Sequence, residues 1–209
     1  GEDYDQLRLR PLDEGYFSLI TGEGQMDFSH RVVANTAFRY QDELPSIEEK
    51  ARAIVILGEG EDARSGVPYV DTLFFLDFTL FYGIYIQRSY RIDIDGIPYV
   101  FFENIDSSFV DAQIWNAYQQ IQAETVAQTP LRWVFNRVVP LEEVYGTFIV
   151  EPGEHHETRI SFLVRIRFGE EAGSIAKFAS EIPIVLRLGL QSGFENCVNI
   201  ARVHQALGE

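Results

Sequence analysis

Apolar and polar residues alternate along most of this chain, with the period of two that is typical of β-strands. The alternation predicts strands at 30–40, 50–57, 71–82, 131–140, 144–150, 158–168 and 183–190. Within 158–168 apolar side chains alternate with three arginines, which indicates a half-exposed antiparallel strand. Within 71–82 both faces are apolar, as in a strand buried between two layers. Gly83 follows and predicts a bend or bulge.

The dipeptide Asp95-Gly96 predicts a tight β-hairpin. A two-residue type I′ turn needs positive φ at both positions, and Asp followed by Gly accepts this at low cost. The register set by this turn places Arg88 opposite Glu103, so we expect the two side chains to meet. The contact is either an exposed ion pair worth under about 1 kcal/mol, or a polar anchor at the mouth of a pocket.

Three segments change to helical spacing. Apolar residues recur at intervals of three and four over 108–126, which predicts an amphipathic helix. A short helix is predicted at 170–180, and a C-terminal helix begins near residue 192 with Cys197 on its apolar side. The order of these elements predicts an α+β fold, with a curved, mainly antiparallel β-sheet and two or three helices packed against it.

Length and composition fit one domain, because 209 residues with 46% hydrophobic content can bury a single core. We place this α+β domain at 16–209, after a flexible N-terminal leader at 1–15. A second mobile segment is expected at the acidic, glycine-bearing loop 58–66. The single cysteine excludes an intramolecular disulfide.

The chain is strongly acidic, with 32 Asp and Glu against 17 Lys and Arg and a net charge of −15. This charge repels phosphate backbones and anionic lipid headgroups, so no nucleic acid partner is expected. Charged residues interrupt the richest apolar run before it reaches the length of about 18 residues that a membrane span requires. The chain starts without Met and with a polar leader. This start favours removal of an export signal, and hence a periplasmic or secreted location, although artificial trimming would leave the same start.

Motifs that carry chemistry are few. No nucleophile elbow occurs, and no glycine loop has the pattern of a nucleotide site. His155 and His156 form the one local cluster of metal-capable side chains. Neighbours on a strand point to opposite faces, however, so we interpret them as exposed turn residues. Paired acids such as Asp93 with Asp95 arise easily among 32 carboxylates. We therefore predict no catalytic residue, no cofactor and no metal ion, and an enzyme is the least favoured interpretation.

Asp77 interrupts the apolar run 71–82. A carboxylate at this place lies at a sheet face open to a cavity, pairs with a cation such as Arg132 or Arg187, or faces water on a partly open strand. The water-facing alternative is the simplest one, and the other two make Asp77 a candidate site residue.

The density of Phe and Tyr over 69–102 supports two hypotheses. In the first, the curved sheet and the helix 108–126 enclose a pocket for an apolar or amphipathic small molecule, and the chain is a non-catalytic, extracytoplasmic binding domain. The predicted lining consists of Tyr82, Tyr85, Tyr90, Tyr99 and Trp115, with Asp77, Arg88 and Glu103 placed to orient a polar end of the ligand. In the second, the aromatic residues fill a closed core, and the chain is a structural or protein-interaction module of the cell envelope without a ligand.

Overall fold

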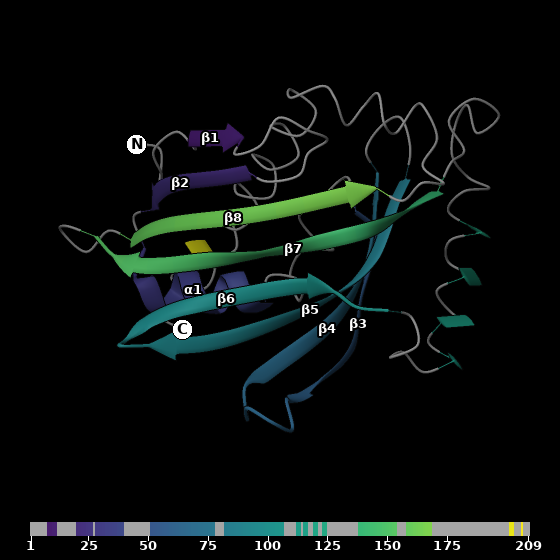
Figure 1. Cartoon of the computed structure of the whole chain (residues 1–209), viewed down its shortest axis with the longest axis horizontal. Helices are drawn as coiled ribbons and strands as arrows, with labels where there is room; N and C mark the ends of the chain where they lie inside the picture. The colour runs from purple at the N-terminus through teal and green to yellow at the C-terminus, as the bar shows by residue number, and fades with distance from the viewer. Residues whose placement is uncertain are drawn as a thin grey trace.

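The computed structural model describes a single β-sheet and a helix beside it (Figure 1). The described residues are 8–11, 20–26, 28–39, 51–77, 82–106, 112–113, 115–116, 119–120, 123–124, 138–153, 158–168, 201–202 and 206. The elements are β1 (Arg8–Pro11), β2 (Ile20–Met26), α1 (His30–Arg39), β3 (Ala51–Glu61), β4 (Pro68–Asp77), β5 (Tyr82–Ile94), β6 (Ile97–Asn104), β7 (Val138–Pro152) and β8 (Thr158–Phe168).

The eight strands form one sheet in the order β1-β2-β8-β7-β6-β5-β4-β3. The pairings are antiparallel except for a short parallel contact between the start of β5 and the start of β7. In Figure 1, β3 and β4 cross the direction of β7 and β8 steeply, so the sheet is twisted and curved. The predicted α+β fold with a curved, mainly antiparallel sheet is confirmed.

The prediction of a strand at 30–40 is wrong, because α1 occupies His30–Arg39. Ser29 begins the helix: its carbonyl accepts a hydrogen bond from the Val33 amide at 3.1 Å, and its hydroxyl accepts one from the Val32 amide at 3.4 Å. The buried side chains of the helix are Val32, Val33, Ala34, Thr36 and Ala37. The pair of β-branched valines favours a strand by propensity alone, and packing of this apolar side overrides that preference.

The predicted hairpin at Asp95-Gly96 is confirmed. Asp95 has φ of 52° and Gly96 has φ of 80°, the positive values that this turn requires. The register is also as predicted, since Arg88 lies opposite Glu103 and Ile94 lies opposite Ile97. This turn therefore fixes which side chains of β5 and β6 share a face.

Several strand boundaries differ from the prediction. The strand expected at 71–82 ends at Asp77, and Gly83 lies within β5 in regular register with β4, so no bulge occurs there. The strand expected to end at Pro140 instead continues through β7 to Pro152. Pro140 sits where β7 pairs with β5, just before a register shift at 141–143, and a residue without an amide hydrogen is tolerated at such an interruption of the ladder. Residues 131–137 lie outside the described part.

Residues 58–61 of the loop that we expected to be mobile belong to β3, and residues 62–67 form the hairpin turn between β3 and β4. Asp62 Oδ1 accepts hydrogen bonds from the amides of Arg64 and Ser65 at 3.0 and 2.9 Å, and from the Ser65 hydroxyl at 2.8 Å. The Asp62 amide also donates to the Val67 carbonyl at 2.9 Å. A single carboxylate thus organises the turn, and this geometry is not visible in the composition of the loop.

The sheet has two faces, because successive residues of a strand point to opposite sides. The inner face packs against α1 and holds the larger buried cluster, which consists of Phe28, Val32, Val33, Ala34, Phe102, Leu141, Val144, Val150, Ile160, Phe162, Val164 and Ala201. The outer face holds the smaller cluster of Leu73 and Ile86, against which Val55, Leu57, Ile84, Ile105 and Trp115 pack. The inner face is therefore the principal core of the described residues.

Two of the predicted helices are represented among the described residues. Positions 112–113, 115–116, 119–120 and 123–124 are helical, and so are 201–202 and 206. Ala201 has no exposed surface and belongs to the inner cluster. The predicted helix at 170–180, the predicted strand at 183–190 and Cys197 lie outside the described residues. Among the helices that the structure describes, none has the length and apolarity needed to cross a membrane.

Candidate functional site

Three polar side chains are buried side by side on the inner face, and we call them the polar row: Thr72 on β4, and Gln87 and Ser89 on β5. Thr72 and Gln87 are direct cross-strand partners, and Ser89 follows two residues along β5 on the same face. Their exposed fractions are 1%, 4% and 2%. Because uncharged polar groups are seldom buried without hydrogen bonds, these three residues form the candidate site.

Hydrogen bonding within the polar row is incomplete. Gln87 Nε2 donates to Ser89 Oγ at 3.0 Å. Thr72 Oγ1 has no hydrogen-bond partner among the described residues. A buried hydroxyl in that state costs about 1 to 3 kcal/mol. The row therefore carries hydrogen-bonding capacity that the described part of the fold does not use.

Aromatic side chains flank the polar row on the inner face. Phe74 and Tyr85 stack with ring centroids 5.1 Å apart. Phe102, Phe148 and Phe162 follow one another across β6, β7 and β8, with successive centroids 5.4 and 6.0 Å apart. The Tyr85 hydroxyl is neutral at pH 7, and burial raises its pKa further above the ordinary value of 10.0. The inner face thus combines an aromatic lining with an uncharged polar row.

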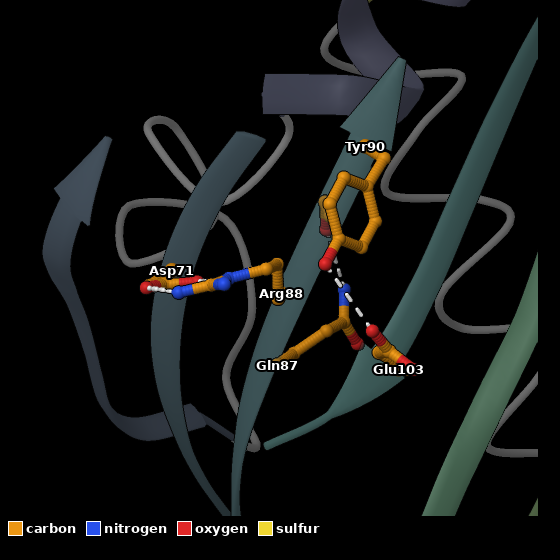
Figure 2. Close-up of polar contacts among 6 residues, drawn as sticks. Asp71, Gln87, Arg88, Tyr90 and Glu103 are labelled. Carbon is orange, nitrogen blue, oxygen red and sulfur yellow. Dashed lines mark hydrogen bonds and ion pairs between the residues drawn. The ribbon is translucent and has the colours of Figure 1, made fainter. Parts of the chain in front are cut away.

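A second polar group lies on the outer face of the same strands (Figure 2). The Arg88 guanidinium makes two hydrogen bonds to Asp71, with Nε 2.6 Å from Oδ1 and Nη2 2.7 Å from Oδ2. The ring of Tyr69 covers the guanidinium, with the Arg88 Cζ atom 4.1 Å from the ring centroid. The bonds to Asp71 raise the pKa of Arg88, which keeps it charged. This group has the geometry of a structural ion pair that joins β4 to β5.

The predicted contact between Arg88 and Glu103 is replaced by two others. Arg88 turns to Asp71 on β4, and Glu103 accepts a hydrogen bond from the Tyr90 hydroxyl at 3.3 Å, as Figure 2 shows. Asp71 on β4 and Glu103 on β6 both lie directly opposite Arg88 in register. Arg88 pairs with Asp71, which is the more deeply buried of the two carboxylates.

The predicted lining is divided between the two faces. Tyr85 lies on the inner face. The outer face carries Arg88, Tyr90, Tyr99, Glu103 and Trp115, and Tyr99 stacks on Phe101 there with centroids 6.1 Å apart. Asp77 and Tyr82 pair at the ends of β4 and β5, and their side chains lie outside the described part. The structure therefore does not bring the eight predicted residues together on one surface.

Sequence reasoning does not select the polar row. Along β5, Gln87 and Ser89 alternate with Arg88 and Tyr90, so both faces look polar and neither looks buried. Only the pairing with β4, which places Thr72 beside Gln87, shows that one of these faces belongs to the core. The one signal of the polar row in the sequence is Thr72, a polar residue within the apolar run of β4.

Metal-binding geometry does not occur in the described part of the chain. Among the described residues, no group of three or more His, Cys, Asp or Glu side chains could hold a metal ion. His155 and His156 lie outside the described residues, so their interpretation as turn residues stays a prediction.

Searches with the sequence found no matching family model and no matching curated protein. Comparison of structures found many similar folds. Human STARD10 aligns with a TM-score of 0.57 at 8% identity, over 99% of this chain and 74% of that one. The human StarD13 lipid transfer and protein localization domain aligns with a TM-score of 0.55 at 12% identity, over 96% and 83% of the two chains.

An aromatase/cyclase, Zhui from Streptomyces, is also similar, with a TM-score of 0.54 at 10% identity over 95% of this chain and 96% of that one. These identities are too low to carry an activity from one protein to another. The structural similarity establishes the fold alone. The chain shares its α+β architecture with these three proteins.

Proposed function

We propose that this protein binds an apolar or amphipathic small molecule on the inner face of its sheet. The observation that carries the proposal is the polar row of Thr72, Gln87 and Ser89, buried within an aromatic face and only partly hydrogen-bonded among the described residues. Ligand sites combine a mainly apolar lining with a few convergent polar groups. A fold shared with a lipid transfer domain and with an aromatase/cyclase supports this role.

The proposed role is binding without a catalytic step. The three side chains of the polar row carry no carboxylate, imidazole or amine, so they offer no group that exchanges a proton near neutral pH. The neighbouring Tyr85 hydroxyl is neutral at pH 7, and burial raises its pKa further from neutrality. We also propose the extracytoplasmic location expected above, which fractionation of the native host followed by immunoblotting would test.

Native mass spectrometry of freshly purified protein tests the proposal first, and we expect a co-purified small molecule. Titration with the neutral fluorescent probe N-phenyl-1-naphthylamine tests it second. Phe148 is partly buried between Phe102 and Phe162. The substitution Phe148→Ala should weaken probe binding about tenfold. The matched variant Phe101→Ala on the outer face should leave it unchanged. No retained molecule and no saturable probe binding would refute the proposal.

A protein-interaction module is the second candidate, and one observation favours it. Three large hydrophobic side chains, Ile94, Phe101 and Tyr145, are exposed by 48%, 37% and 42% on the outer face. Exposed apolar patches of this kind mark contact surfaces for protein partners. If Phe101→Ala, rather than Phe148→Ala, removes the binding activity that is found, the interaction module is the better description.

A further inference from the structure

The polar row on the inner face consists of uncharged groups in an apolar setting. Thr72 is flanked along β4 by the buried Val70 and Phe74, and Ser89 lies opposite the buried Phe102. Whatever polar group approaches these side chains leaves water for surroundings of low polarity. An ion in that position requires a partner of opposite charge, whereas a neutral group requires only hydrogen bonds.

Charged side chains near the row are already engaged. The next residue of β5 on the inner face is Arg91, whose guanidinium hydrogen-bonds to Asn35 of α1 and lies 3.6 Å from Asp93 Oδ1. Arg88 points to the outer face, where Asp71 neutralises it. The described inner face therefore offers no unengaged cation for a carboxylate or phosphate, and no carboxylate beside the row for an amine.

The hydrogen-bonding capacity of the row suits a neutral oxygen. A threonine or serine hydroxyl both donates and accepts, and the amide of Gln87 does the same through separate atoms. Thr72 Oγ1 is without a partner among the described residues and is fully buried, so a ligand oxygen beside it would gain a bond at a place where solvent does not compete. An aliphatic group alone would leave this hydroxyl unsatisfied.

Resting on the proposed function, we infer that the ligand of the inner face is an apolar molecule with an uncharged hydroxyl or carbonyl group, and that Thr72, Gln87 and Ser89 hold that group. Amphiphiles with an ionic headgroup are excluded from this position by the cost of burying the charge. The polar row thus sets the class of ligand, and the aromatic lining supplies the affinity for its apolar body.

The test compares three ligands that share a twelve-carbon chain: dodecan-1-ol, dodecanoate and dodecylammonium. Each is titrated at pH 7 against protein loaded with N-phenyl-1-naphthylamine. We expect dodecan-1-ol to bind at least about tenfold more tightly than either ion, and Thr72→Val to weaken dodecan-1-ol about tenfold. Thr72→Ser keeps a hydroxyl and should restore binding. The matched control is Thr147→Val, at a half-buried threonine on the outer face that should have no effect.

Ser89→Ala provides a second variant that removes a hydroxyl with little change in volume, and it keeps the test decisive if Thr72→Val does not fold. The inference fails if an ionic ligand binds as tightly as dodecan-1-ol, or if neither variant weakens dodecan-1-ol. In those cases the probe still binds, and the proposed function survives. If neither the probe nor any twelve-carbon ligand binds, the proposed function itself fails.

Discussion

Arg88 and Asp71 hold β4 and β5 together through two parallel hydrogen bonds of 2.6 and 2.7 Å, while the hairpin partner of Arg88, Glu103, bonds to a tyrosine. The two side chains of the pair are only 19% and 13% exposed. A planar guanidinium matches a carboxylate at two points, which fixes the geometry of both groups. The pair should therefore contribute more to the stability of the fold than an exposed ion pair does.

Replacing Asp71 should reveal how much the Arg88–Asp71 pair contributes to stability. In Asp71→Ala the Arg88 guanidinium loses its counter-charge in a largely buried position, so we expect the free energy of unfolding to fall by about 2 to 3 kcal/mol. Urea denaturation at pH 7 measures this change in the free energy of unfolding. The control is Glu103→Ala, whose exposed carboxylate bonds to Tyr90 at 3.3 Å and should cost less than about 1 kcal/mol. Equal losses in the two variants would contradict this assignment.

Gly146 is a position on β7 that tolerates no side chain. A Cβ atom there would lie 2.1 Å from the Leu163 carbonyl oxygen and 2.7 Å from Phe102 Cζ. Since the first obstacle is backbone of the neighbouring strand, Gly146→Ala should destabilise the protein by about 3 kcal/mol or more. The matched control is Gly58→Ala, where nothing lies within 4 Å of the added atom. Thermal denaturation of the two variants provides the comparison, and a stable Gly146→Ala protein would show that the spacing of β7 and β8 is wrong.

The turn after β3 should depend on pH through Asp62. Hydrogen bonds from the Ser65 amide, the Ser65 hydroxyl and the Arg64 amide lower the pKa of Asp62 below its ordinary value of 3.8. A lowered pKa in the folded state means that this stabilisation is present above 3.8 and is lost as the pH falls through the folded-state pKa.

Amide hydrogen exchange at Arg64 and Ser65 measures this dependence. We expect protection at neutral pH that Asp62→Ala removes and Asp62→Asn partly keeps, because an asparagine oxygen accepts the same bonds. An unchanged exchange rate in Asp62→Ala would rule out the carboxylate as the organiser of the turn.

Alkaline pH should act on the inner face through Tyr85. Burial raises the pKa of this hydroxyl above its ordinary value of 10.0. The stability that depends on the neutral hydroxyl is therefore complete below pH 10 and declines as the pH rises from there towards the folded-state pKa. We expect Tyr85→Phe to keep more of its neutral-pH stability at pH 11 than the parent chain, as measured by urea denaturation. The exposed Tyr145→Phe serves as the control, and an equal gain in that variant would argue against Tyr85 as the cause.

The sequence predicts the local geometry of the hairpin at Asp95-Gly96 well, but it does not predict the contacts between this hairpin and the strands beside it. Asp95-Gly96 determines the register of β5 and β6, because the turn and both strands are contiguous. The preference of Arg88 for Asp71 depends on β4, which pairs with β5 on its other side, and no pattern within one hairpin contains that information.

The same limitation explains the candidate site. The polar row arises where Thr72 of β4 meets Gln87 of β5 under a covered face, and neither burial nor pairing is visible in the alternation of β5. Likewise α1 is a helix because its apolar side packs on the inner face, whereas the local preference of its valines favours a strand. Tertiary contacts decide both features.

The parallel contact of β5 with β7 has a consequence for the segment 105–137 that joins β6 to β7. Asn104 leaves the sheet opposite Gln87, and Val138 returns opposite Tyr82, so both anchors lie on β5 about 17 Å apart along the strand. With its ends fixed on one rigid strand, doubling the length of this segment would add only about 0.6 kcal/mol of loop-closure free energy. The segment 105–137 can therefore change in length during evolution while the hydrogen bonds of the strands around it stay intact.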